Sequence, residues 1–291
     1  SGTYNLEIKD GNGCTANVNY VVYPQLVSSA VLTKPLECTT TPDAIITLNT
    51  SGGNTVPGPT NYTYQVSFNG TPNVASMNPY TATAAGTYVF TITDANNATA
   101  CTTTASITLD PIPSTVFNTT QTAVSCNGGA DGTITVTVTA GEGPYEYQLD
   151  SGIFQTSNVF SGLSAGTAYV VTVRNARLCL VSSGPITISE PALLTATAGF
   201  TANTTCSPTT IITVIPAGGN GGYLFNFNGL GYTTANTYTV NNLTTPTPVS
   251  YTVKDAKGCV TGSQSVTTPA LNPPTDMDIT GTPIYCVQQG L

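Results

Sequence analysis

Eight cysteines are the residues of this chain whose type and spacing could do chemistry, and no histidine accompanies them. A C-x-x-C pair, or a cluster of Cys and His, would indicate a zinc site. Here the two nearest cysteines, Cys14 and Cys38, lie 24 positions apart. Without histidine, a Ser-His or Cys-His nucleophile is unavailable. The cysteines therefore predict disulfide bonds in an oxidising, extracellular setting, rather than a metal centre or an enzyme.

The cysteines form two interleaved series that share one period. Intervals of 88, 80 and 80 residues separate the first series, which is Cys38, Cys126, Cys206 and Cys286. Intervals of 87, 78 and 80 residues separate the second series, which is Cys14, Cys101, Cys179 and Cys259. A proline series keeps the same period, at Pro24, Pro111, Pro191 and Pro269. A fixed period of this kind indicates tandem structural repeats.

The segments between the cysteines alternate apolar and polar residues, as half-buried strands do. One such segment follows each of the first three first-series cysteines. These segments are DAIITLNTSGG (43–53), DGTITVTVTAG (131–141) and TTIITVIPAGG (209–219). A later strand in each repeat starts at a tyrosine, which is the tyrosine-corner position of immunoglobulin-like sandwiches. These four tyrosines are predicted core residues: Tyr4, Tyr88, Tyr169 and Tyr251. We expect an all-β chain of tandem immunoglobulin-like antiparallel β-sandwich repeats that form an extended rod.

The period also predicts the domain boundaries. Three complete immunoglobulin-like repeats are expected, here called repeats 1, 2 and 3, at residues 24–110, 111–190 and 191–268. The C-terminal strands of a preceding repeat would occupy residues 1–23, and the first strand of a following repeat residues 269–291. The chain opens on SGTYNLEIKDG, inside the repeat pattern, so we expect it to be a segment of a longer protein.

The run CNGGADGTITVTVTAGEGPYEYQLDSG…GLSAGTAYVVTVRNARLC (126–179) resembles an SprB-type repeat. These repeats occur in large cell-surface adhesins of gliding Bacteroidota. Repeat 1 departs from the family pattern with CTTTPDA in place of CNGGADG, and repeat 3 lacks the glycine of the Gly-Thr-Tyr strand. The resemblance implies an exported, surface-attached, multi-repeat protein that is delivered by the type IX secretion route.

The sandwich topology limits how the cysteines can pair. In each repeat the first cysteine follows strand A and the second follows strand F, at opposite ends of strands that span about 26 Å. Because a disulfide needs Cα atoms about 5–6 Å apart, a bond within one repeat is disfavoured. Pairing with the next repeat predicts Cys38–Cys179 and Cys126–Cys259, with the other four cysteines bonded outside the segment. Bonds between neighbours in sequence (14–38, 101–126, 179–206 and 259–286), bonds within a repeat, and free thiols stay open as alternatives.

Acidic residues supply two further candidate sites. Oxygen ligands at domain joints suit Ca²⁺, and the acids near the joints are Asp94, Asp110, Glu190, Asp255, Asp276 and Asp278. The repeats do not carry these acids consistently, so turn formation is the preferred interpretation and no cofactor is predicted. Glu142 and Glu146 are close in sequence but flank a turn between strands, which indicates solvated charges rather than a catalytic carboxylate pair.

Charge and hydropathy exclude two classes of partner. A net charge of −8 with six basic residues cannot build the basic face that nucleic acid requires. No apolar run is long enough to insert into a membrane. The expected partners are neighbouring repeats of the same chain, with surface polysaccharide, other cell-surface proteins or laterally associated copies as further possibilities.

The sequence thus predicts a structural stalk or adhesin segment of a large secreted cell-surface protein, with a role in attachment or gliding. The expected role is mechanical, namely to hold a binding tip away from the cell and to bear load. Two alternatives remain: a carbohydrate-binding module array attached to a secreted enzyme, and a subunit of a self-assembling extracellular fibre.

Overall fold

A computed structural model describes residues 1–39, 41–54, 62–96, 101–201, 209–241 and 245–270 of the chain. The described residues form strands and turns, with no helix among them, and so none that could cross a membrane. The chain divides into two compact units. Unit 1 comprises residues 1–120, 135–159 and 169–186, and unit 2 comprises residues 121–134, 160–168 and 187–291. This division runs through residues 111–190, so the repeat boundaries stay predictions.

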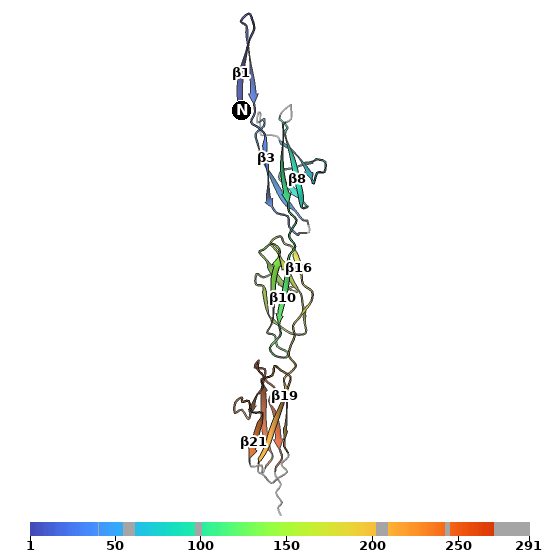
Figure 1. Cartoon of the computed structure of the whole chain (residues 1–291), viewed down its shortest axis with the longest axis vertical. Helices are drawn as coiled ribbons and strands as arrows, with labels where there is room; N and C mark the ends of the chain where they lie inside the picture. The colour runs from blue at the N-terminus through green and yellow to red at the C-terminus, as the bar shows by residue number, and fades with distance from the viewer. Residues whose placement is uncertain (40, 55–61, 97–100, 202–208, 242–244, 271–291) are drawn as a thin grey trace, which may run out of the picture. The chain divides into compact units, whose positions relative to one another are not determined.

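Unit 1 begins with a hairpin of two strands, β1 (Gly2–Lys9) and β2 (Thr15–Val22), which pair antiparallel with each other. A two-sheet sandwich follows (Figure 1). One sheet has the order β3-β4-β7 and the other the order β6-β5-β8-β9. The strands are β3 (Val27–Lys34), β4 (Ala44–Ser51), β5 (Tyr62–Phe68), β6 (Val74–Ser76), β7 (Tyr80–Ala82), β8 (Gly86–Asp94) and β9 (Thr102–Leu109).

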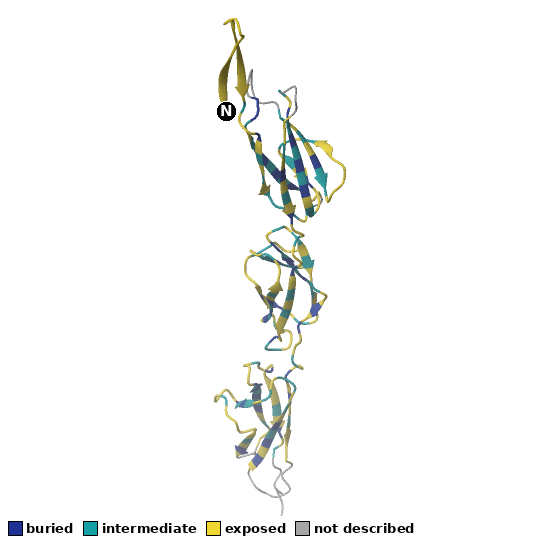
Figure 2. Cartoon of the chain, turned by 45° about the horizontal axis from the view of Figure 1, so that its top comes forward, coloured by how far each residue is buried: buried dark blue, intermediate teal, exposed yellow. Residues whose placement is uncertain are grey.

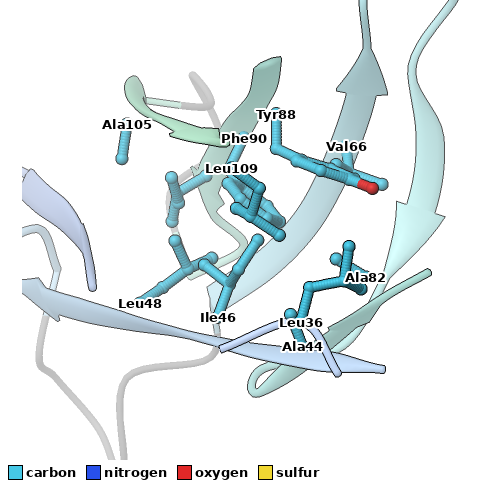
Figure 3. Packing of buried hydrophobic residues seen from close by; sticks show 11 residues of the cluster. Leu36, Ala44, Ile46, Leu48, Val66, Ala82, Tyr88, Phe90, Ala105 and Leu109 are labelled. Atoms are coloured by element: carbon cyan, nitrogen blue, oxygen red, sulfur yellow. The ribbon is translucent and has the colours of Figure 1, made fainter. Parts of the chain in front are cut away.

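The core of this sandwich follows from the period-two pattern of its strands. Residues along β4 and β8 alternate between buried and less buried positions, because successive side chains of a strand point to opposite faces. Figure 3 shows Ile46 and Leu48 pointing toward Phe90 and Leu109, across the space between the sheets. Each fully buried side chain of this size stabilises the fold by about 1.5–3 kcal/mol. The alternation of buried and exposed residues along the strands is visible in Figure 2.

The next strands lie between residues 116 and 187. Wholly within unit 1, β12 (Glu146–Leu149), β15 (Val171–Arg174) and β16 (Leu180–Ser182) form an antiparallel sheet in that order. Five strands contain residues of both units: β10 (Val116–Thr122), β11 (Gly132–Ala140), β13 (Val159–Leu163), β14 (Ala168–Tyr169) and β17 (Ile186–Thr187).

Unit 2 contains a second complete pair of sheets, with the orders β18-β19-β21 and β20-β22-β23. Its strands are β18 (Thr195–Phe200), β19 (Thr209–Ala217), β20 (Leu224–Phe227), β21 (Thr237–Asn241), β22 (Thr247–Lys254) and β23 (Gln264–Thr268). Ile212 and Val214 of β19 pack with Phe225, Val249 and Val253 in one buried cluster.

The strand orders identify the fold class. Lettered in chain order, unit 2 has sheets A-B-E and C-F-G, and the sandwich of unit 1 has A-B-E and C′-C-F-G. This is the antiparallel arrangement of immunoglobulin-like and fibronectin-type sandwiches. The predicted all-β, immunoglobulin-like fold class is confirmed.

Candidate functional site

Three of the second-series cysteines, Cys14, Cys179 and Cys259, each end a turn that an Asx side chain organises. In unit 2, Asp255 Oδ1 accepts hydrogen bonds from the N–H groups of Lys257 (2.9 Å) and Cys259 (3.0 Å). The N–H of Asp255 donates to the carbonyl of Cys259 (2.9 Å). Asn175 makes the same bonds, with its Oδ1 accepting from the N–H of Cys179 at 2.9 Å. The turn therefore presents the cysteine in one fixed place, which is the role that Asp and Asn commonly have in turns.

The same turn occurs once more in unit 1, at Cys14, whereas Asp94 precedes Cys101 by seven positions instead of four. In the hairpin, Asp10 Oδ1 accepts from the N–H groups of Asn12 and Cys14, both at 2.9 Å. Asp94 accepts from the N–H groups of Asn54 and Asn96, and its own N–H donates to the carbonyl of Cys101 (3.0 Å). These carboxylates thus accept hydrogen bonds from backbone donors.

None of the described residues forms a group of three or more His, Cys, Asp or Glu side chains that could hold a metal ion. Of the acids weighed as calcium ligands, Asp94 and Asp255 organise turns, and Glu190 Oε2 accepts a hydrogen bond from the N–H of Gly128 (2.7 Å). Asp276 and Asp278 lie outside the described residues.

The first joint, here called joint 1, surrounds a disulfide between Cys38 and Cys179 in unit 1. Their Cα atoms are 4.7 Å apart, and 141 positions separate them in sequence. The N–H of Cys38 donates to the carbonyl of Arg177 at 2.8 Å. Cys38 follows strand A of predicted repeat 1, and Cys179 follows the Asx turn in predicted repeat 2. A covalent bond and a backbone hydrogen bond therefore hold the two segments together.

The Arg177 side chain adds a second layer to joint 1. Its Nη1 donates to the carbonyl of Leu36 (3.2 Å), and its Nε donates to Glu142 Oε2 (3.0 Å). Leu36 belongs to the buried core of the first sandwich. The planar guanidinium can bond in two directions at once, which a lysine ammonium does less well. Arg177 thus connects the core segment of one predicted repeat to a turn of the next.

The second joint, joint 2, surrounds a disulfide between Cys126 and Cys259 in unit 2. Their Cα atoms are 5.7 Å apart, and the sequence separation is 133. Asn220 supplies the polar support here. Its Nδ2 donates to the carbonyl of Ser125 (2.9 Å) and to Asp255 Oδ2 (2.8 Å). One amide side chain therefore contacts both the segment before Cys126 and the turn that carries Cys259.

Asp255 is a buried carboxylate with donors on both oxygens. Burial by itself raises the pKa of Asp255, but hydrogen bonds from the Asn220 side chain and from backbone N–H groups favour the ionised form. Together they place its pKa below the ordinary value of 3.8. The Asp131 carboxyl also has a lowered pKa, chiefly because Ser125 donates hydrogen bonds to it. Joint 2 is therefore organised around carboxylates that stay charged at neutral pH.

Residues 118–154 match the family model of the SprB repeat. The chain contains an SprB-type repeat region. The match covers β11 and β12, as well as Cys126 of joint 2. None of the curated proteins matches the chain.

Three of the solved structures that are similar to this chain are arrays of several domains. The three N-terminal domains of the bacteriophage RB49 Highly Immunogenic Outer Capsid protein share 14% identity, with a TM-score of 0.36 over 85% of this chain and 96% of that one. Extracellular domains 3–5 of Drosophila OTK share 10%, with a TM-score of 0.22 over 81% and 93%. The N-terminal eight Ig domains of Down Syndrome Cell Adhesion Molecule share 11%, with a TM-score of 0.26 over 93% and 51%.

The two bonded pairs are the ones that the repeat topology predicts, Cys38–Cys179 and Cys126–Cys259. Since all four of these cysteines are occupied, the scheme of sequence-adjacent pairs and the scheme of bonds within one predicted repeat do not describe this chain. Cys14 is an exposed free thiol, and Cys101 is also exposed. Cys206 and Cys286 lie outside the described residues.

The four predicted core tyrosines have different environments. Tyr88 is buried, and its hydroxyl donates to the carbonyl of Ala84 (2.8 Å), as in a tyrosine corner. Tyr251 is buried too, but its hydroxyl donates to Gln264 Oε1 (2.7 Å). Tyr169 is only partly buried. For Tyr4 the core assignment is wrong in this structure, because β1 pairs only with β2 and no second sheet covers the hairpin among the described residues.

Glu142 and Glu146 do not form a carboxylate pair, because each binds its own arginine. Glu142 bonds Arg177, and Glu146 Oε2 lies 2.6 Å from Arg174 Nη2. Sequence reasoning missed Arg177 and Asn220 as joint residues. The signals were present: Arg177 lies in an Asx turn beside a bonded cysteine, and Asn220 lies in GGNGG before a strand. Arginine does not recur at the position of Arg177, whereas asparagine recurs at that of Asn220, because GGN stands at residues 52–54 and again at 218–220.

Proposed function

We propose that this chain is a stalk segment of a secreted cell-surface protein, in which disulfide-bridged joints transmit mechanical load from one SprB-type repeat to the next. The observation that carries the proposal is that each bond links the segment after strand A of one predicted repeat to the strand F–G turn of the next. A bond inside a domain would support only that domain, whereas these bonds connect successive ones.

The same bonds support the proposed cellular setting. Disulfides persist in oxidising compartments and are rare in the cytosol, which supports an extracellular location. The resemblance to SprB-type repeats supports attachment to the surface of a gliding bacterium and delivery by type IX secretion. A chain without histidine is a poor source of acid–base or nucleophilic catalysis, and we propose no enzymatic role for it.

The two bonds overlap in sequence, and the overlap has a mechanical consequence. With both bonds present, the shortest covalent path between the chain ends follows residues 1–38, then 179 back to 126, then 259–291. At about 3.6 Å per residue, that path extends to roughly 450 Å, against roughly 1,050 Å for the chain without bonds. The two bonds therefore limit the extension of the chain even when every sandwich has unfolded.

Pulling a single molecule by its two ends tests this proposal. We expect a contour length of about 450 Å without reductant and about 1,050 Å with dithiothreitol. The variant C126A/C259A, which keeps only the bond of joint 1, is the matched control and should reach about 550 Å without reductant. A contour length near 1,050 Å for the untreated chain would contradict a load-bearing role for the joints.

A further inference from the structure

An aromatic ring and a cation meet on the outer face of the sheet β20-β22-β23 in unit 2. Asn226 of β20 pairs with Thr252 of β22, and both point away from the core because their neighbours in each strand are buried. The hydroxyls of Tyr232 and Thr252 share a hydrogen bond of 3.1 Å, which places the ring beside this row of residues. The Nζ of Lys254 lies 4.4 Å from the centroid of the same ring.

Aliphatic side chains flank Lys254 on both sides. Leu224 pairs with it on one side, and Val260, which is 50% exposed, forms a bridge with it on the other. Among the described residues no carboxylate lies within ion-pair distance of the Lys254 Nζ, whereas Arg174 and Arg177 each have one. Lys254 therefore presents an unneutralised positive charge beside apolar surface. Six residues make up this surface, here called the Tyr232 face: Leu224, Asn226, Tyr232, Thr252, Lys254 and Val260.

A similar arrangement occurs in unit 1, on the outer face of the sheet β12-β15-β16. The Arg174 guanidinium carbon lies 4.0 Å from the centroid of the Phe154 ring. Gln148 pairs with Thr172, so an amide and a threonine again form the neighbouring row. Here, however, Glu146 Oε2 lies 2.6 Å from Arg174 Nη2 and neutralises the cation. The two faces share their geometry and differ in charge.

The first sandwich has the same row of residues without the ring and the cation. Gln65 pairs with Thr91 on one side and with Ala75 on the other, so alanine stands where the other two sheets have an aromatic residue. Thr93 stands at the position of Lys254, directly before the Asx residue of the F–G turn. The fold of this sheet therefore requires the amide and the threonine row at most, and the ring and the cation need another explanation.

The groups of the Tyr232 face suit a sugar that carries a carboxylate. An aromatic ring offers a large apolar surface against which the C–H groups of a sugar ring can pack. Amide and hydroxyl groups bond to sugar hydroxyls, and an ammonium group forms a charge-assisted hydrogen bond with a carboxylate. Sites for small molecules are concave, whereas the face of a sheet is open and suits a polymer that lies across it.

We propose that the Tyr232 face binds an acidic polysaccharide, with a sugar ring packed on Tyr232 and its carboxylate paired with Lys254. The Asn226 side chain is oriented for this role, because its Oδ1 accepts a hydrogen bond from the N–H of Gly231 (3.1 Å) and its Nδ2 can donate to a sugar hydroxyl.

The acidic character of the ligand is argued from the local charge. At physiological ionic strength exposed charges more than about 8 Å apart are largely screened, so Lys254 decides the interaction rather than the net charge of the whole chain. Asp255, the next residue, is buried, and its oxygens accept hydrogen bonds from N–H groups. This site adds a ligand to the proposed stalk and does not depend on its disulfide-bridged joints.

Calorimetric titration of the full chain with polygalacturonate, in the absence of calcium, tests the proposal. Its methyl ester is the matched polymer without charge, and we expect it to bind at least about ten-fold more weakly because the pair with Lys254 is lost. Polyglutamate, a polyanion without sugar rings, should bind at least as weakly as the ester. Backbone amide chemical shifts should change in β20 and β22 when polygalacturonate binds.

Two variants of the Tyr232 face separate the ring from the charge. Tyr232→Ala and Lys254→Thr should each weaken the binding of polygalacturonate about ten-fold or more. Lys254→Thr installs the residue that the first sandwich has at this position, so the strand is expected to keep its fold, and an unchanged urea midpoint checks this. Gln65→Ala, on the sheet that lacks the ring and the cation, is the matched control and should leave the affinity unchanged.

Three results would each overturn the proposal. The first is the absence of both heat and shift changes with polygalacturonate. The second is equal affinity for polyglutamate, because an acidic polypeptide would then fit the face as well as a sugar does. The third is unchanged affinity in Tyr232→Ala and Lys254→Thr, which would place the binding elsewhere. None of these results alters the contour lengths expected from the disulfides, so the two proposals fail separately.

Discussion

The two joints place a disulfide at the same position but surround it with different polar groups. At joint 1, the Arg177 guanidinium bonds the carbonyl of Leu36 and the carboxylate of Glu142. At joint 2, the Asn220 amide bonds the carbonyl of Ser125 and the carboxylate of Asp255. In both cases one side chain donates to a main-chain carbonyl that lies close before the first-series cysteine.

The difference between the joints shows which part of the design is general. The cysteine and its Asx turn are common to both, because the disulfide needs a fixed Cα position. The supporting side chain is free to vary, since any donor of suitable reach can satisfy an exposed carbonyl. The turn residue differs as well: Asn175 is neutral at joint 1, whereas Asp255 is a buried carboxylate at joint 2.

The largest expected effect comes from removing one bond at a time. We expect C38A/C179A and C126A/C259A each to lower the free energy of unfolding of the affected sandwiches by about 2–4 kcal/mol, because the unfolded chain gains freedom. Urea unfolding without reductant measures this change. The original chain in dithiothreitol is the control, and its free energy of unfolding should fall by at least as much as that of either variant. Unchanged midpoints in both variants would show that the bonds restrain extension without stabilising the sandwiches.

A smaller effect is expected at Asp255, and it should depend on pH. Asp255→Asn places an amide where several N–H groups donate hydrogen bonds. We expect this change to lower the free energy of unfolding by about 2 kcal/mol at pH 7. The pKa of Asp255 is lowered in the folded state, so its stabilisation is complete above the unfolded value of 3.8 and is lost as the pH falls through the folded value. The difference between the original chain and the variant should therefore shrink below pH 3.8.

Urea midpoints measured from pH 7 down to pH 2.5 follow this difference. Asn175→Asp at joint 1 is the reciprocal variant, since it gives that turn the carboxylate that joint 2 already has. Its stability relative to the original chain should rise with pH in the same range. A constant difference between the Asp255→Asn variant and the original chain at all pH values would contradict the charged turn.

The smallest effect is expected at Arg177. Arg177→Ala removes the hydrogen bonds to Leu36 and Glu142, which lowers the free energy that favours the closed joint by about 1 kcal/mol. We therefore expect dithiothreitol to reduce the Cys38–Cys179 disulfide roughly five-fold faster in this variant. Arg174→Ala is the matched control, because Arg174 also pairs with a glutamate but makes no bond to Leu36. Equal rates of reduction for the two variants would show that the guanidinium does not close joint 1.

Much of the fold could be predicted from local patterns. The alternation in β4, β8 and β19 identified buried positions such as Ile46, Phe90 and Ile212, because a strand side chain alternates faces regardless of its partners. Tyr88 and Tyr251 were predicted core residues and are buried. Tyr4 carries the same local signal and is exposed, because burial requires a second sheet that a strand pattern does not supply.

The sequence by itself determined the strands, the turns and the positions of the cysteines, because those depend on residue order over a few neighbours and on one repeating interval. Only the tertiary structure decided that Arg177 and Asn220 support the joints and that Asp255 is a buried charge. Each of these depends on groups that are far apart in sequence and meet only when the chain has folded.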